Sequence, residues 1–343
     1  MLRYLDLLTD PFSDTRGGFN GPAGQPMGYA QQQSQRQPLP ADAASAYAKV
    51  LKAPAAPPPE TRKWDVWAAG FGGYNRTDGD AVTVGSSNLT SRAYGYAAGF
   101  DYRFTPDSAI GFSLAGGLTN WGLASALGGG SSDVFQAGVY GWKRWNNFYV
   151  SGAIAGAIHD VDTNRTVTVA GVDTLRGNTD AQNIAGRLEL GYRLIAPIVD
   201  FTPYGAAQVQ HYRLNGYTET AAFGSNQFAL SYAEQSSTMT RTELGARLDK
   251  RYAVMGDSVL NLFGRAAWVH DWNRDSALTP TFATLPLTTF TVTGANPDED
   301  LALVTAGAEL ITRSRWALMA KFAGEFGGNT QTYTGTGRIR YTW

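Results

Sequence analysis

The histidine, serine and acidic side chains of this chain are the groups that could carry out catalysis, but their spacing matches no catalytic pattern. The three histidines, His159, His211 and His270, have no metal-ligand spacing with one another. The chain has no cysteine and therefore no thiolate site. The stretch Gly111-Phe-Ser-Leu-Ala115 lacks the second glycine of a nucleophile elbow. These patterns predict no catalytic residue, no metal site and no cofactor.

One neighbouring pair, His270 and Asp271, lies near the end of an expected strand, where a rim site could form. Adjacent residues of a strand point to opposite faces, so these two side chains should not act together. The sequence Gly128-Gly-Gly130 is typical of a turn and not of a phosphate-binding loop. With 28 basic and 29 acidic residues, the net charge of -1 offers no field for nucleic acid. We therefore expect neither an enzyme nor a nucleic-acid-binding protein.

Many charged residues stand at alternate positions between apolar ones, which is the pattern of strands with one polar face. Arg187 and Glu189, for example, flank Leu188. An arginine facing lipid near the middle of a membrane costs about 2–4 kcal/mol, so several such strands must turn their charges inward. The mixed signs favour a solvated ionic network that stiffens the wall. The predicted inward-facing set is Arg187, Glu189, Glu243, Arg247, Arg265, Glu309, Lys321, Glu325, Arg338 and Arg340.

The strands that would carry these charges fill the chain from residue 64 onward. No segment approaches the roughly 20 consecutive apolar residues of a membrane helix. The mean hydropathy of -0.24 suits a membrane barrel, because half of each strand faces water. Short turns alternate with long polar stretches at 160–180, 215–237 and 273–299, as they do in outer-membrane barrels. We expect an all-β transmembrane barrel of 12 antiparallel strands beginning near Trp64, Ser91, Ala109, Ser132, Asn147, Ala181, Phe201, Thr238, Ser258, Asp300, Arg315 and Gln331.

Three segments of different composition can be distinguished along the chain. Residues 1–40 are rich in Gly, Gln, Pro and Ser after the first ten, and we expect a flexible linker. Residues 41–53 are rich in alanine and lysine between Pro40 and Pro54, which predicts a short helix. A proline-rich spacer completes a segment of residues 41–63, and the barrel takes residues 64–343. The start of the chain lacks the apolar region of a secretory signal, so we expect a longer precursor.

The last strand, residues 331–343, alternates most clearly. Gly337, Ile339, Tyr341 and Trp343 share one parity, and Thr and Arg residues take the other. The length suits a tilted membrane strand of roughly 9–11 residues, with aromatic side chains where it meets the headgroups. A strand that runs to the last residue needs a neighbour to hold it, because chain ends usually fray. Such a strand fits a closed barrel.

This terminal strand resembles the C-terminal insertion signal of Gram-negative outer-membrane barrels, carried here by Ile339, Tyr341 and Trp343. Together with the helix-bearing linker, residues 41–343 resemble the translocator domain of autotransporters, the type V secretion proteins. Three local motifs support the resemblance: Ala69-Gly-Phe-Gly-Gly-Tyr-Asn75, Gly99-Phe-Asp-Tyr-Arg103 and Gly116-Gly-Leu-Thr-Asn-Trp121.

The resemblance implies a translocator in the outer membrane of a Gram-negative bacterium that exports an N-terminal passenger. It implies outer-membrane lipid, the barrel-assembly machinery and the chain's own passenger as partners. It also implies that the linker helix, with Tyr47, Lys49 and Lys52, lies in the pore and occludes it, its lysines pairing with Glu243, Glu309 or Glu325. Two alternatives stay open from the sequence: a stand-alone outer-membrane channel for small solutes, and a soluble all-β binding protein.

Overall fold

The computed structural model describes residues 1–9, 63–83, 85–254, 258–273 and 277–343. The expected helix at 41–53, with Tyr47, Lys49 and Lys52, lies outside this part of the chain, as does the linker at 10–40. Among the described residues, no helix is both long enough and apolar enough to span a membrane.

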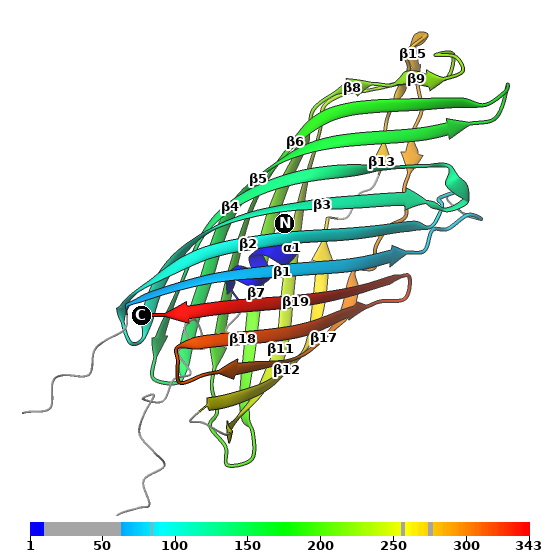
Figure 1. Ribbon diagram of the computed structural model, residues 1–343. Helices are drawn as coiled ribbons and strands as arrows, with labels where there is room; N and C mark the ends of the chain where they lie inside the picture. Colours follow the sequence, from blue (N-terminus) through cyan, green and yellow to red (C-terminus); the bar gives the residue numbers. More distant parts are fainter. Residues whose placement is uncertain (10–62, 84, 255–257, 274–276) are drawn as a thin grey trace, which may run out of the picture.

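Twelve antiparallel strands close into a barrel, as the sequence predicts (Figure 1). The barrel strands are β1 (Trp64–Thr77), β2 (Leu89–Thr105), β3 (Ser108–Leu123), β4 (Gly128–Trp145), β5 (Phe148–Val167), β6 (Asp173–Tyr192), β7 (Asp200–Leu214), β11 (Gln235–Val254), β12 (Ser258–Trp272), β17 (Asp300–Ile311), β18 (Trp316–Phe326) and β19 (Thr330–Thr342). Each pairs with its neighbours in sequence, and β1 pairs with β19 to close the ring. The backbones of Trp64 and Trp343 exchange hydrogen bonds of 3.0 and 3.3 Å at this junction.

The barrel has two ends, which we call the terminal end and the loop end. β1 begins and β19 ends at the terminal end, where short turns connect the strands. At the loop end, β8 (Tyr217–Thr218), β10 (Leu230–Tyr232), β14 (Thr281–Phe282) and β15 (Leu285–Thr289) form a second, four-stranded sheet. Nearby, β9 (Thr220–Phe223) pairs with β6, and β13 (Ala277–Leu278) pairs with β16 (Val292–Thr293).

The structure corrects the expected loop at 160–180, most of which is strand. β5 and β6 both have 20 residues and pair from Phe148–Tyr192 up to Val167–Asp173. The hydropathy pattern missed this extension because its outward residues, such as Asp160, Asp162 and Asp180, are polar. Where a strand extends out of the membrane into water, its outward side chains can be polar, just as those within the membrane must be apolar.

The outer wall presents an apolar band. Trp316, Leu318, Phe322 and Phe326 of β18 all point outward and are exposed, while Met319 and Ala323 are buried. β18 has 11 residues, and a tilted strand of that length spans about 25 Å of bilayer. Trp316 and Tyr341 pack together at the terminal end, and Phe326 and Tyr333 at the other, so aromatic side chains border the band on both sides.

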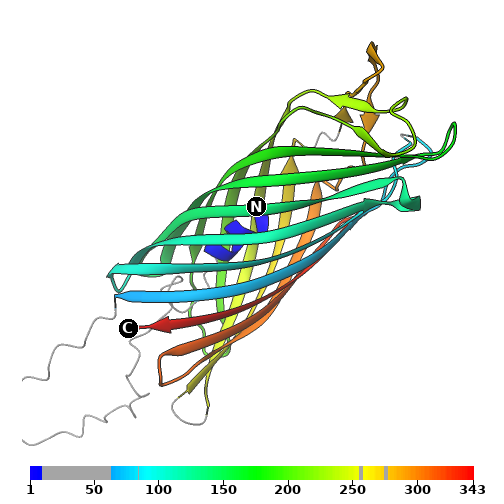
Figure 2. The same ribbon diagram turned by 45° about the horizontal axis from the view of Figure 1, so that its top comes forward.

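A helix lies inside the barrel, but its residues are not the ones that the sequence analysis proposed. α1 (Leu2–Thr9) has 8 residues and lies within the ring of strands in both views (Figures 1 and 2). The assignment of residues 1–40 to a flexible linker is therefore wrong for this first segment. A helix this short has little stability in water, so the barrel must supply the contacts that hold it.

Candidate functional site

The barrel interior carries a network of buried ion pairs, and most of the expected inward-facing residues belong to it. Arg187 of β6 donates to Glu243 of β11 at 2.7 Å and to Glu189 at 3.0 Å. Arg247 of β11 donates to Glu189 at 2.6 Å and lies 3.9 Å from the ring centre of Tyr204. All four charged side chains are almost fully buried. The network joins β6 to β11 over the inner face of β7, so it stiffens this part of the wall.

A second part of the network lines β12, β17, β18 and β19. Arg241 binds Asp271 at 2.7 Å and Glu325 at 3.3 Å, and Arg340 lies 3.4 Å from Glu309. Arg265, Lys321 and Arg338 are also on the inner face, with little exposed side chain. The structure thus places the ten proposed lining residues inside the barrel.

The three histidines do not share a site. His159 lies inside, where its Nδ1 is 3.1 Å from Ser132 Oγ. His270 lies on the outer face with its Nδ1 2.8 Å from Asp300, whereas Asp271 points inward to Arg241. Within the described residues, no three His, Asp or Glu side chains gather closely enough to hold a metal ion.

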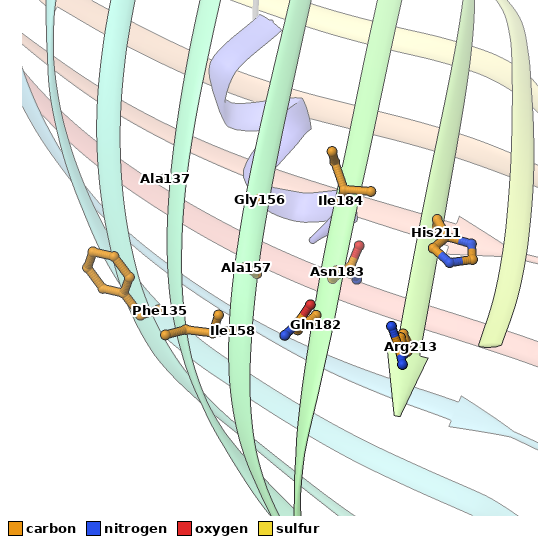
Figure 3. Close-up of a pocket in the computed structure, with 10 residues that line it drawn as sticks. All are labelled: Phe135, Ala137, Gly156, Ala157, Ile158, Gln182, Asn183, Ile184, His211 and Arg213. Carbon is orange, nitrogen blue, oxygen red and sulfur yellow. The ribbon is translucent and has the colours of Figure 1, made fainter. Parts of the chain in front are cut away.

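His211 borders an apolar groove on the outer wall (Figure 3). The groove has a volume of about 730 Å³ and is lined by Phe135, Ile158 and Ile184, with α1 on the other side of the wall. These three side chains belong to the apolar band, so lipid chains would fill the groove, and the His211 Nδ1 lies 2.8 Å from the Thr238 hydroxyl at its border.

The polar side of α1 faces the ionic wall. Arg3 binds Glu325 at 3.0 Å. Asp6 binds Arg265 at 3.1 Å and lies 3.6 Å from Lys321. Opposite charges on helix and wall therefore meet at each contact.

The apolar side of α1 faces a surface made largely of alanines. Tyr4, Leu5 and Leu8 are at most 1% exposed and pack in one cluster with alanines of β1, β2, β3, β5 and β6 and with Trp67 and Tyr140. Tyr4 also donates its hydroxyl proton to the carbonyl oxygen of Ser113 at 2.9 Å. A Cβ at Gly138 would lie 2.8 Å from Leu8 Cδ1, so the absence of a side chain there makes room for Leu8. The alanines of this surface are Ala69, Ala97, Ala115, Ala153, Ala155 and Ala185.

Sequence reasoning missed Arg3, Tyr4 and Asp6, although a signal for them exists. The segment Leu-Arg-Tyr-Leu-Asp-Leu-Leu-Thr places apolar residues on one side of a helix and Arg3 and Asp6 on the other. The pattern covers only two helical turns. It indicates a helix inside the barrel only once the lumen is known to have one side lined by alanines and one lined by charged residues.

The helix is oriented along the barrel axis. Glu325, the partner of Arg3, stands one residue before the loop end of β18, and Lys321, near Asp6, lies nearer the terminal end. The amino end of α1 therefore faces the loop end. Between α1 and the wall formed by β1, β18 and β19, a cavity of about 10 Å³ remains, room for roughly one water.

This closed ring with an internal helix can be compared with known proteins. The family model described as the autotransporter beta-domain matches residues 66–323, which is most of the chain. The chain belongs to the autotransporter β-domain family. The resemblance stated from the terminal strand and the local motifs is confirmed.

Solved autotransporter domains share the fold. The translocator domain of NalP from Neisseria meningitidis superposes with a TM-score of 0.65 at 13% identity, over 88% of this chain and 93% of that one. The β-domain of the Bordetella autotransporter BrkA gives 0.60 at 16% identity, over 82% and 100%. At this level of identity the likeness concerns the fold alone.

A longer relative is the extracellular serine protease of Serratia marcescens, which is 25% identical over 271 residues. The match covers 77% of this chain and 25% of that protein, so the chain spans about a quarter of its relative. As an autotransporter β-domain, this chain is an outer-membrane barrel of a Gram-negative bacterium that acts in passenger export. The loop end is accordingly the extracellular end and the terminal end the periplasmic one.

Proposed function

We propose that this barrel exports the polypeptide segment N-terminal to α1, and that α1 then stays in the lumen and closes it. The two-sided fit of α1 carries the proposal, since its apolar side meets alanines and its charged side meets opposite charges. The cavity of about 10 Å³ beside the helix supports tight closure along that wall. The amino end of α1 faces the cell exterior, which is the side that an exported segment must reach.

The lumen supplies the free energy that an isolated helix of this length lacks. Burial of one large apolar side chain stabilises by about 1.5–3 kcal/mol, and Tyr4, Leu5 and Leu8 are all buried. The ion pairs of Arg3 and Asp6 add to this and fix the rotation of the helix. The alanine surface is as necessary as the charges, because larger side chains would fill the space of α1.

The β-domain works in this proposal without catalysis, and any enzymatic activity of the whole protein resides in the exported segment. Insertion depends on the terminal strand, with Ile339, Tyr341 and Trp343 as the signal that the barrel-assembly machinery reads. The outward positions of Ile339 and Trp343, both well exposed, support access to a partner before lipid covers them.

Conductance across planar bilayers tests closure by α1. Deletion of residues 1–9 should raise the single-channel conductance severalfold, because a helix about 10 Å wide leaves the lumen. The matched control is Arg213→Ala, which breaks an exposed ion pair with Glu234 outside the lumen and should leave conductance unchanged. Equal conductance of the deletion variant and the full chain would contradict the proposal, because a part of the chain other than α1 would then close the lumen.

A further inference from the structure

The loop end of the barrel is higher on one side, where two loops fold into a rigid platform. Glu219 accepts hydrogen bonds from the Arg165 guanidinium at 2.6 and 3.1 Å and from the Leu230 amide at 3.0 Å. Tyr217 and Tyr232 stack with ring centres 4.7 Å apart, and burial raises the pKa of both phenols, so both stay neutral. These contacts fix β8, β9 and β10 against the top of β5 and β6.

The second loop joins the same platform. The Ala283 amide donates to the Ala229 carbonyl at 2.8 Å, and the Thr284 hydroxyl to the Gln227 carbonyl at 3.2 Å. The Ser225 amide donates to Asp173 at 2.7 Å, which anchors the turn to the start of β6. Three separate segments therefore meet in a single hydrogen-bonded tip.

This tip carries large apolar side chains that face water. Val172, Phe223 and Leu285, which we call the apolar tip, are 54%, 68% and 60% exposed. Gly224, next to Phe223, has a φ of +85°, and a Cβ there would lie 2.8 Å from the Val172 carbonyl, so the two turns are in contact. Leu285 follows Thr284, which binds the same turn through Gln227.

The apolar tip lies well above the membrane. β6 has 20 residues and β18 has 11, and the difference of nine places the start of β6 about 20 Å beyond the apolar band. Lipid cannot cover side chains at that height. Exposed apolar side chains on a rigid surface mark a site of interaction, since their contact with water is unfavourable.

We propose that the apolar tip binds extended, apolar segments of the polypeptide as they leave the barrel. This inference rests on the proposed export function and names the first surface that an exported segment meets. The amino end of α1 faces the mouth beside this platform, so a chain that precedes α1 emerges next to it. Transient burial of Phe223 and Leu285 against such a chain would keep it from slipping back into the lumen.

The test uses the full chain with an epitope-tagged, unfolded reporter polypeptide fused before Met1. A photo-crosslinking residue replaces Phe223 or, as control, Val82, which is 97% exposed on the loop between β1 and β2. We expect about tenfold more reporter adduct at position 223, because burial of a large apolar side chain shifts a binding equilibrium by at least that factor. The inference is overturned, and export stays intact, if the reporter reaches the cell surface but position 223 gives no more reporter adduct than position 82. It is also overturned if the adducts at 223 are to another barrel or to glycolipid.

A second variant separates binding from folding of the platform. Phe223→Ser with Leu285→Ser should reduce crosslinking from a probe at Val172 by about tenfold, while Val82→Ser should not change it. Migration of the unheated barrel on gels reports whether the double variant is folded. A folded variant with undiminished crosslinking contradicts the inference. If the reporter never becomes accessible to external protease, the export proposal itself fails, and the inference falls with it.

Discussion

Asp6 holds α1 to the charged wall through two cations from different strands. Arg265 comes from β12 and Lys321 from β18, and Glu243 lies 3.9 Å from Arg265 on the same side of the lumen. The Asp6 carboxylate thus interacts with two positive charges of the wall at once. Asp6 is the residue of α1 on which the electrostatic fit depends most.

Asp6→Asn should increase the fraction of time that the pore is open by about tenfold, because loss of a charged hydrogen-bonding partner costs about 1–3 kcal/mol. Single-channel recording measures this fraction directly. Asp78→Asn serves as the control, since it removes the exposed ion pair with Arg76 outside the lumen and should have no effect. Unchanged gating in the Asp6 variant would show that apolar packing alone retains the helix.

Among the elements, α1 and β4 are matched in shape. Leu8 occupies the space above Gly138, and a Cβ added there would lie 2.8 Å from Leu8 Cδ1. The inner surface of β4 to β6 therefore sets where the helix can lie along the barrel axis.

Gly138→Leu should displace α1 and expose residues 2–9 to amide hydrogen exchange, because the new side chain fills the site of Leu8. Hydrogen-exchange mass spectrometry in detergent measures this protection. Gly335→Ala is the matched control, as a Cβ there has no neighbour within 4 Å. Full protection of α1 in the Gly138 variant would mean that the wall yields instead of the helix.

The strands were easier to predict than the helix, for a physical reason. A membrane strand must keep charges such as Arg247 and Glu189 on one side over its whole length, and this constraint is visible in the sequence alone. The twelve strands and their order followed from it, with β6 beginning at Asp173 and not near Ala181. The position of α1 depends on surfaces brought together from eight strands, β1 to β6, β12 and β18, so the amphipathic pattern of two helical turns could not be interpreted without them.

At the level of the whole molecule, closure depends on the pairing of the first and last strands. β1 and β19 pair from Asp65–Thr342 to Thr77–Thr330. Asp65 lies within reach of Arg340 and of the Thr342 hydroxyl, so an ionic contact fastens the periplasmic end of the junction. The terminal strand therefore serves both as the proposed insertion signal and as the closing element.

Tyr341→Ser with Trp343→Ser should reduce the amount of folded barrel in the outer membrane by about tenfold, since both aromatic side chains anchor the strand at the periplasmic interface. Quantitative blots of heat-resistant and heat-denatured forms measure the yield. Tyr252→Ser, at the same end on β11, should have a smaller effect, because it removes an interfacial ring without touching the final strand. Equal yields from all three proteins would argue against a role of the terminus in insertion.

The unequal lengths of β6 and β18 give the extracellular opening a slanted outline. The wall at β6 extends further from the membrane than the wall at β18, so an emerging chain contacts the β6 side after it has cleared the β18 side. A polypeptide leaving this barrel would therefore not exit along the axis, and its path would be biased to one side before any part of it folds. The shape of the exit, and not only the width of the passage, would then influence where on the cell surface the exported protein begins to take form.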